Sequence, residues 1–407
     1  MVLFGVYAVL NVWTWWGTEP ATTWDSPRYT GGDLLLFLNP GVPPTALFSA
    51  FENASVATLI QTLLYSAAWM SLAGAVLASL RATWVRWPLA LLPLVVSLAS
   101  PLWSWNLVVG SEGLTVTAMV AWLSTLVWLA ASSRSAALIG SAIAASALLV
   151  TRPQTLIFVV PIQVIATAWW VRRTQRSFGK SRQLLAWLAV LLIAATGWAT
   201  FRAALLANDD VYSFRYALHN LVEKTPSFRE YVLNEAPPCE AIPAALNGPQ
   251  PWTDVIAFDN TLISLCPETF IWFKSDAVAV QTWVAYDPAA AALNFRDVMS
   301  GIALPVGADV SPLPDRLDGA VLPTGNVWLA IAVASVLGLV LGVAGRVRYR
   351  VTALGVTGLV LAVGAVGVYL FAVWAADGYD VIRHMVPVTT LLPVAALVLP
   401  TALTGKR

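Results

Sequence analysis

Long apolar segments alternate with short polar ones along this chain, and the alternation predicts membrane-spanning helices. A helix needs roughly 20 predominantly apolar residues to cross about 30 Å of hydrocarbon, and the apolar segments here are about 15 to 25 residues long. They cover approximately residues 2–16, 56–80, 87–105, 107–131, 136–150, 155–171, 184–205, 327–345, 351–375 and 385–403. The pattern predicts an all-α polytopic membrane protein with about ten transmembrane helices.

The distribution of charged residues predicts on which side of the membrane each connection lies. The chain is 58% hydrophobic and 11% charged, whereas a soluble domain carries about a quarter charged residues. All 22 acids fall in or beside alternate connections. Basic residues fill the other connections: Arg81 and Arg86; Arg134; Arg172, Arg173, Arg176, Lys180 and Arg182; Arg346, Arg348 and Arg350; Lys406 and Arg407. The positive-inside rule makes the basic connections and both ends cytoplasmic.

The same pattern divides the chain into three regions. Residues 1–205 hold the first seven helices and a long first outer connection, 17–55. Residues 206–325 are polar enough for an extracytoplasmic domain of mixed structure, and residues 326–407 hold the last three helices. A cleaved signal peptide is the alternative for the first segment, but a positively charged start is missing. We therefore expect a multi-pass protein of the cytoplasmic (inner) membrane.

The first outer connection carries the stretch W-D-S-P-R-Y-T-G-G-D, which puts Asp25, Arg28, Tyr29 and Asp33 within ten residues at the membrane boundary. This clustering at the membrane boundary makes the two acids candidates for a functional site. In the alternative interpretation, Ser26 or Asp25 caps a short helix with Pro27 at its first position, and both acids are ordinary surface residues.

Other candidates come from charges near predicted helix ends. Glu112 follows the start of the fourth segment, and a carboxylate at membrane level usually faces a polar cavity or a basic partner. Arg28, Arg152 and Arg383 are cations on the outer side, and His384 follows Arg383. An anionic ligand would explain these cations, and ion pairs with outer acids are the alternative.

Cys239 and Cys266 are the only cysteines, and both fall in the predicted outer domain. Disulfides persist outside the cytoplasm, so we expect one structural disulfide between them. The sequence contains no Walker loop, dinucleotide loop, nucleophile elbow or nucleic-acid motif.

Several short motifs occur in an order that resembles the GT-C superfamily of integral-membrane glycosyltransferases. They are W-D-S-P-R-Y with Asp33 behind it, N-P-G-V-P-P at 39–44, Ser111-Glu112, T-R-P-Q at 151–154, the large outer region, and R-H-M-V-P at 383–387. The resemblance is to bacterial members, especially actinobacterial ones. Paired adjacent acids, which well-known members carry in the first loop, are absent here.

The resemblance implies a specific chemistry at the outer face of the membrane. A polyprenyl-phosphate sugar would be the donor, and an envelope glycan, glycolipid or protein the acceptor. Asp25, in preference to Asp33, would be the general base of an inverting displacement. Arg28, Arg152, Arg383 and His384 would hold the departing phosphate, while Tyr29 and Glu112 would contact substrate. No cofactor is required, a divalent cation is left open, and no nucleic-acid partner is expected.

Two other functions fit a chain of this composition. A transporter or flippase of lipid-linked sugars or anions predicts ionisable residues in mid-span, whereas nearly all charges here lie at segment ends. An oligosaccharide polymerase or ligase would use a diphosphate-linked donor and Arg-rich outer loops, and few Arg residues lie outside. A purely structural membrane protein is the remaining alternative.

Overall fold

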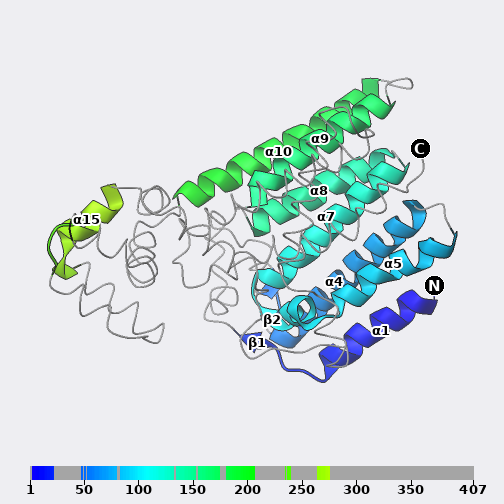
Figure 1. Ribbon diagram of the computed structural model, residues 1–407, viewed down its shortest axis with the longest axis horizontal. Helices are drawn as coiled ribbons and strands as arrows, with labels where there is room; N and C mark the ends of the chain where they lie inside the picture. Colours follow the sequence, from blue (N-terminus) through cyan, green and yellow to red (C-terminus); the bar gives the residue numbers. More distant parts are fainter. Residues whose placement is uncertain are drawn as a thin grey trace. The chain divides into compact units, whose positions relative to one another are not determined.

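The computed structural model describes about half of the chain, and this part is mostly helical (Figure 1). The described residues are 2–22, 47–48, 50–51, 53–79, 83–132, 134–152, 155–174, 180–206, 234, 236–239 and 264–275. The last three predicted spans lie outside these ranges. So do most of the first outer connection and most of the predicted outer domain.

Each of the first seven predicted spans corresponds to a helix. Their bounds are α1 Val2–Trp16, α4 Ala54–Ser79, α5 Thr83–Ser97, α7 Glu112–Ser132, α8 Ser135–Thr151, α9 Leu156–Thr174 and α10 Lys180–Leu206. Two of them, α4 and residues Glu112–Leu129 of α7, are long and apolar enough to cross a membrane. Shorter apolar stretches occupy α1, α8, α9 and α10.

The third predicted span, residues 87–105, is wrong in its bounds. Helix α5 ends at Ser97, and the chain then forms α6 (Ser100–Trp103), the 3-10 turn η2 (Ser104–Leu107) and the short strand β2 (Val108–Val109). Strand β1 (Ala21–Thr22) pairs with β2 in parallel. The apolar residues 98–109 therefore continue the hydrophobic pattern without continuing the helix, because Leu98, Ala99, Leu102 and Trp103 are buried against neighbouring elements instead.

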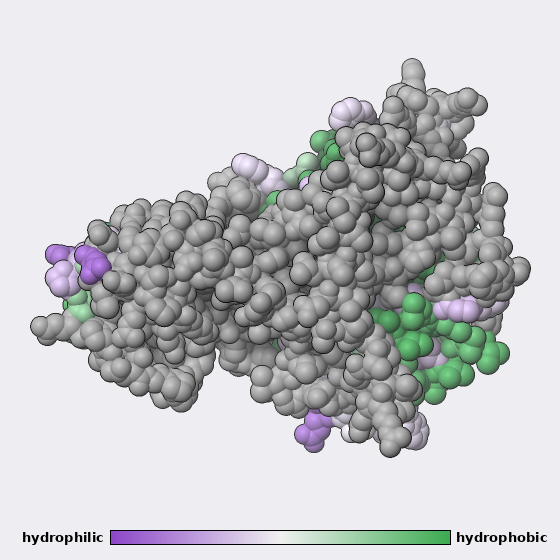
Figure 2. Space-filling view, in the orientation of Figure 1, coloured by the Kyte–Doolittle hydropathy of each residue, from purple (hydrophilic) through white to green (hydrophobic). Residues whose placement is uncertain are grey.

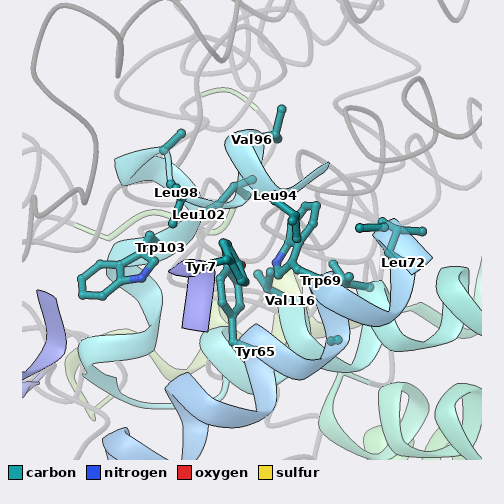
Figure 3. Close-up of a cluster of buried hydrophobic side chains, with 14 of the residues drawn as sticks. Tyr7, Tyr65, Trp69, Leu72, Leu94, Val96, Leu98, Leu102, Trp103 and Val116 are labelled. Atoms are coloured by element: carbon teal, nitrogen blue, oxygen red, sulfur yellow. The ribbon is translucent and has the colours of Figure 1, made fainter. Parts of the chain in front are cut away.

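Helix α4 packs mainly against α7, α5 and α1. Its buried face contributes Tyr65, Trp69 and Leu72 to a hydrophobic cluster. Figure 3 shows these side chains gathered with Tyr7, Leu94 and Trp103, which come from elements far apart in the sequence. The rings of Tyr65 and Trp69 meet edge to face at 5.9 Å.

Hydrogen bonds fasten α1 to this cluster. The Tyr7 and Ser97 hydroxyls lie 2.7 Å apart, and Trp103 Nε1 donates to Asn11 Oδ1 at 2.6 Å. Near the end of α1, Trp15 Nε1 donates to the Thr58 hydroxyl at 3.2 Å. Polar groups of α1 thus face the protein interior.

A second set of polar contacts joins α7, α8 and α9. Trp122 Nε1 donates to Gln163 Oε1 at 2.9 Å, and Gln163 Nε2 donates to Ser141 Oγ at 2.8 Å. All three side chains are buried. A Gln on α9 therefore specifies how three apolar helices pack, since its amide is satisfied only in this arrangement.

The chain separates into two compact units, and the first, unit 1, takes in the described residues as far as Leu205. The second, unit 2, begins at Leu206 and includes α15 (Pro267–Ser275). A disulfide joins Cys239 to Cys266, just before α15. The Thr269 hydroxyl also donates to the carbonyl of Pro237 at 3.1 Å, so two links tie α15 to residues 236–239.

Candidate functional site at the junction of α7 and α8

An ion pair joins two of the residues that the sequence singles out. Arg152 Nη2 donates to Glu112 Oε1 across a separation of 40 residues. Glu112 is the first residue of α7, and Arg152 directly follows the last residue of α8. Glu112 is 2% exposed and Arg152 is 7% exposed. Two charged residues from different sequence motifs are therefore buried together.

The ends of α7 and α8 favour these two charges. Only two residues separate α7 from α8, so the helices run in opposite directions and the end of α8 meets the start of α7. A helix N-terminus stabilises a negative charge, and a C-terminus stabilises a positive one. Glu112 and Arg152 occupy the ends where the helix dipoles support their charges.

Local hydrogen bonds fix the backbone on both sides of the pair. The Thr115 hydroxyl donates to the carbonyl of Ser111 at 2.7 Å, which holds the first turn of α7. The Arg152 amide donates to the carbonyl of Leu148 at 2.8 Å, and the Thr155 hydroxyl donates to the Arg152 carbonyl at 2.7 Å. The guanidinium and the carboxylate are therefore carried by rigid segments.

Burial of such a pair is poor evidence that it was selected for stability. Desolvating two charges offsets most of their attraction, whereas removing one partner costs about 3–5 kcal/mol, because a charge is left unpaired in the interior. Apolar residues of similar volume would hold two helix ends equally well. The pair holds a guanidinium in a fixed position, which is what directed recognition of an anion requires.

Two glycines allow the close approach around Glu112. A Cβ at Gly110 would lie 2.7 Å from Glu112 Oε2. A Cβ at Gly113 would lie 2.6 Å from the Trp105 carbonyl oxygen and would collide with the Gln61 amide. Any larger residue at 113 would push α7 away from α4 and η2.

Two buried amides beside this junction were not among the residues that the sequence singled out. Gln61 Nε2 donates to the Trp105 carbonyl at 3.0 Å, and Asn106 Nδ2 donates to the Trp103 carbonyl at 2.9 Å. Within the described ranges, Gln61 Oε1 and Asn106 Oδ1 have no hydrogen-bond partner. A polar residue inside an apolar segment was the one available clue to Gln61. Asn106 lies between the third and fourth predicted spans, where nothing in the sequence singled it out.

Both ends of the acidic first outer segment are anchored at strand β2. Thr22 pairs with Val109 at the start of the segment. At the other end, Phe48 packs with Val109 and Ala57 in a small buried cluster. Val109 is only three residues from Glu112, so the segment that carries the predicted acids begins and ends beside the ion pair.

The remaining predicted site residues fall on parts of the chain that the structure does not describe. Asp25, Arg28, Tyr29 and Asp33 lie outside the described residues, as do Arg383 and His384. Glu112 and Arg152 are the predicted substrate and phosphate ligands that the structure does bring together, and each is the other's partner. The sequence left two interpretations of Arg152, an anionic ligand or an ion pair with an outer acid. The structure shows the ion pair.

No protein-family model, curated protein or solved structure matches this chain.

Proposed function

We propose that this protein is a multi-pass protein of the bacterial inner membrane with about ten spans. The burial pattern of helix α1 supports a membrane location, because its polar Tyr7 and Asn11 are buried while Val9 and Trp13 are 66% and 77% exposed. This arrangement is unfavourable in water and favourable in hydrocarbon. Figure 2 shows the exposed apolar side chains gathered over α1. Helix α10 likewise exposes Trp187 and Trp198.

Within that membrane, we propose an inverting glycosyltransferase of the GT-C type, acting at the outer face on a polyprenyl-phosphate sugar. The observation that carries the proposal is the buried Glu112–Arg152 pair beside the anchored ends of the acidic segment. The pair holds the Arg152 guanidinium in place. Arg152 belongs to the T-R-P-Q motif, to which the resemblance assigns phosphate binding. Envelope glycan, glycolipid and protein acceptors all fit this chemistry.

We prefer Asp25 to Asp33 as the base. Asp25 is three residues along the chain from Thr22, which pairs with Val109, whereas Asp33 is eleven residues from Thr22.

The reaction would be a single displacement. The Asp25 carboxylate takes the proton of an acceptor hydroxyl, the hydroxyl oxygen attacks the anomeric carbon, and the bond from that carbon to the phosphate oxygen breaks. The electron pair leaves with polyprenyl phosphate, whose developing charge Arg28, Arg383 and His384 stabilise. Glu112 orients Arg152 toward the same charge, and Tyr29 contacts the sugar.

The test is a transfer assay on the full-length protein, purified in detergent and supplied with a panel of polyprenyl-monophosphate sugars and an envelope-glycan acceptor. We expect Asp25→Asn to lower turnover by about 10²-fold or more, since general-base catalysis contributes roughly that factor. Released polyprenyl phosphate is the measured product.

Glu19→Gln is the matched control, because Glu19 is an exposed acid of the same outer connection. We expect it to keep wild-type turnover. Full activity in Asp25→Asn would overturn the assignment of the base. Release of no polyprenyl phosphate from any donor by a folded wild-type protein would overturn the proposed reaction and favour transport or a diphosphate-linked donor.

A further inference from the structure

Four side-chain amides are buried in the described part of the chain, and they are of two kinds. In Asn11 and Gln163, the amide nitrogen donates a hydrogen bond and the amide oxygen accepts one. In Gln61 and Asn106, the nitrogen donates, but the oxygen has no hydrogen-bond partner within the described ranges. Gln61 and Asn106 are both 0% exposed. Two fully buried acceptors are therefore unpaired in a protein that satisfies its other buried amides.

Both incomplete amides lie beside the buried ion pair. The Gln61 nitrogen donates to the Trp105 carbonyl at 3.0 Å, and Asn106 is the next residue in the chain. The Gln61 amide also lies against Gly113, where a Cβ would collide with it. Gly113 directly follows Glu112 at the start of α7. The two unpaired oxygens thus belong to residues at the junction of α4, η2 and α7, where the proposed function places the phosphate.

The nitrogen atoms keep both amides in their present orientation. Gln61 Nε2 is held by the Trp105 carbonyl, and Asn106 Nδ2 donates to the Trp103 carbonyl at 2.9 Å. In an amide group, the nitrogen and the oxygen are bonded to the same carbon and point apart. Turning either amide to pair its oxygen would therefore leave its nitrogen unpaired. A donor from a ligand removes the free-energy cost of the unpaired oxygen without this loss.

The charges around the junction favour a neutral donor over a cation. Amide oxygens can bind hard cations, but such sites normally include carboxylates that balance the charge. The acid at this junction, Glu112, is already paired with Arg152, whose positive charge repels other cations. A hydroxyl group donates to an amide oxygen without bringing in charge. A sugar ring carries several hydroxyl groups on one rigid frame and can therefore satisfy both oxygens.

We propose that the side-chain oxygens of Gln61 and Asn106 accept hydrogen bonds from hydroxyl groups of the donor's sugar. This inference rests on the proposed function, since its ligand is a polyprenyl-phosphate sugar with the phosphate at Arg152. Because both oxygens are fully buried, the sugar reaches them when neighbouring side chains move. A buried acceptor rejects a ligand that lacks the matching hydroxyl, because the acceptor is then left unpaired. The two amides thereby help to determine which sugar is used.

The test compares ligands that differ only in the sugar. One is polyprenyl methyl phosphate, which keeps the phosphodiester charge and has no sugar hydroxyl. The others are the mannose, glucose and arabinofuranose derivatives of the same polyprenyl phosphate. Native mass spectrometry of the full-length protein in detergent measures the affinity for each. The quantity of interest is the sugar ratio, defined as the affinity for the sugar derivative divided by that for the methyl ester. We expect a wild-type sugar ratio of about tenfold or more for at least one sugar.

Gln61→Met and Asn106→Leu each remove one acceptor oxygen while nearly conserving volume. We expect each to lower the sugar ratio about fivefold, which corresponds to one hydrogen bond of about 1 kcal/mol. A variant that folds less completely binds less of both ligands, so its sugar ratio is unaffected by folding. Two variants on different elements provide independent measurements of the same site.

Gln163→Leu is the matched control. Gln163 is also a buried amide, but its oxygen already accepts from Trp122 Nε1 at 2.9 Å. We expect this variant to lose stability and to keep the wild-type sugar ratio. A sugar ratio near one for every sugar in the wild type would overturn the inference, as would unchanged ratios in both Gln61→Met and Asn106→Leu. An equal fall in Gln163→Leu would also overturn it, because the ratio would then report general packing.

The same proteins separate this inference from the proposed function. A sugar ratio that depends on Gln61 and Asn106, without transfer to any acceptor, would support the sugar site and reject the glycosyltransferase in favour of transport. Transfer activity in the wild type, with sugar ratios unchanged in both amide variants, would support the reaction and reject the sugar site.

Discussion

Among the described residues, Glu112 and Arg152 are the two charged side chains that are almost fully buried. Each charge lowers the free-energy cost of burying the other, because an unpaired charge in the interior costs several kcal/mol while a paired one costs much less. Their positions at opposite helix ends add favourable dipole interactions. The two residues should therefore behave as one unit when they are substituted.

Substitution of one partner should be worse than substitution of both. Glu112→Gln leaves the Arg152 guanidinium without its carboxylate, and we expect the free energy of unfolding to fall by about 3–5 kcal/mol. Adding Arg152→Met removes the buried charge and should recover a large part of that loss. Chemical unfolding in detergent measures both. A double variant less stable than Glu112→Gln alone would contradict the pairing.

At the scale of elements, α1 is built with its polar side inward. Asn11 is fully buried and accepts from Trp103 Nε1, and Tyr7 lies against Ser97 on α5. Hydrogen bonds of this kind hold an apolar helix in one orientation, since van der Waals contact alone distinguishes poorly between faces that are both apolar. Helix α1 is thereby fixed as a member of the bundle.

Asn11→Leu tests this attachment. The change keeps the volume but leaves the buried indole N–H of Trp103 without its acceptor, which should cost about 1–3 kcal/mol. Trp103→Phe in the same chain removes that donor, so a double-mutant cycle should give a coupling energy clearly different from zero. Thr14→Val serves as control, because the Thr14 hydroxyl donates only within α1. Simple additivity of Asn11→Leu and Trp103→Phe would contradict the interaction.

At the scale of the whole molecule, the chain consists of two units with different means of stabilisation. Unit 1 relies on apolar helix packing with a few buried polar contacts. In unit 2 the described contacts include the Cys239–Cys266 disulfide and the bond from Thr269 to Pro237. A disulfide that closes a loop of this length stabilises by about 3 to 4 kcal/mol, chiefly by restricting the unfolded chain.

Loss of the disulfide should therefore affect unit 2 alone. Cys239→Ser, Cys266→Ser and the double variant should all lose the same stability, about 3 to 4 kcal/mol, because either change breaks the bond. Limited proteolysis should show new cleavage on the C-terminal side of α10, while the fragment that contains α1 to α10 persists. Additive losses from the two single substitutions, or early cleavage within unit 1, would contradict this division.

The described helices could be predicted from the sequence because long apolar segments leave a strong signal. α1 begins and ends at the predicted residues, and α4, α8, α9 and α10 differ from prediction by only a few. The region from Leu98 to Val109 could not be predicted, because hydropathy does not distinguish a buried turn from a continuing helix. The same region contains Asn106 and β2, which explains why that part of the candidate site was missed.

The sequence by itself determined where the described helices lie, how charges are distributed along the chain, and which polar residues near helix ends are candidates for function. Each of these depends on the local composition of the chain. Only the tertiary structure decided that Glu112 pairs with Arg152, that β1 and Phe48 meet at Val109, and that Gln61 reaches the Trp105 carbonyl. Those contacts join residues far apart in sequence, and their partners are selected by packing and by the cost of leaving buried polar groups unpaired.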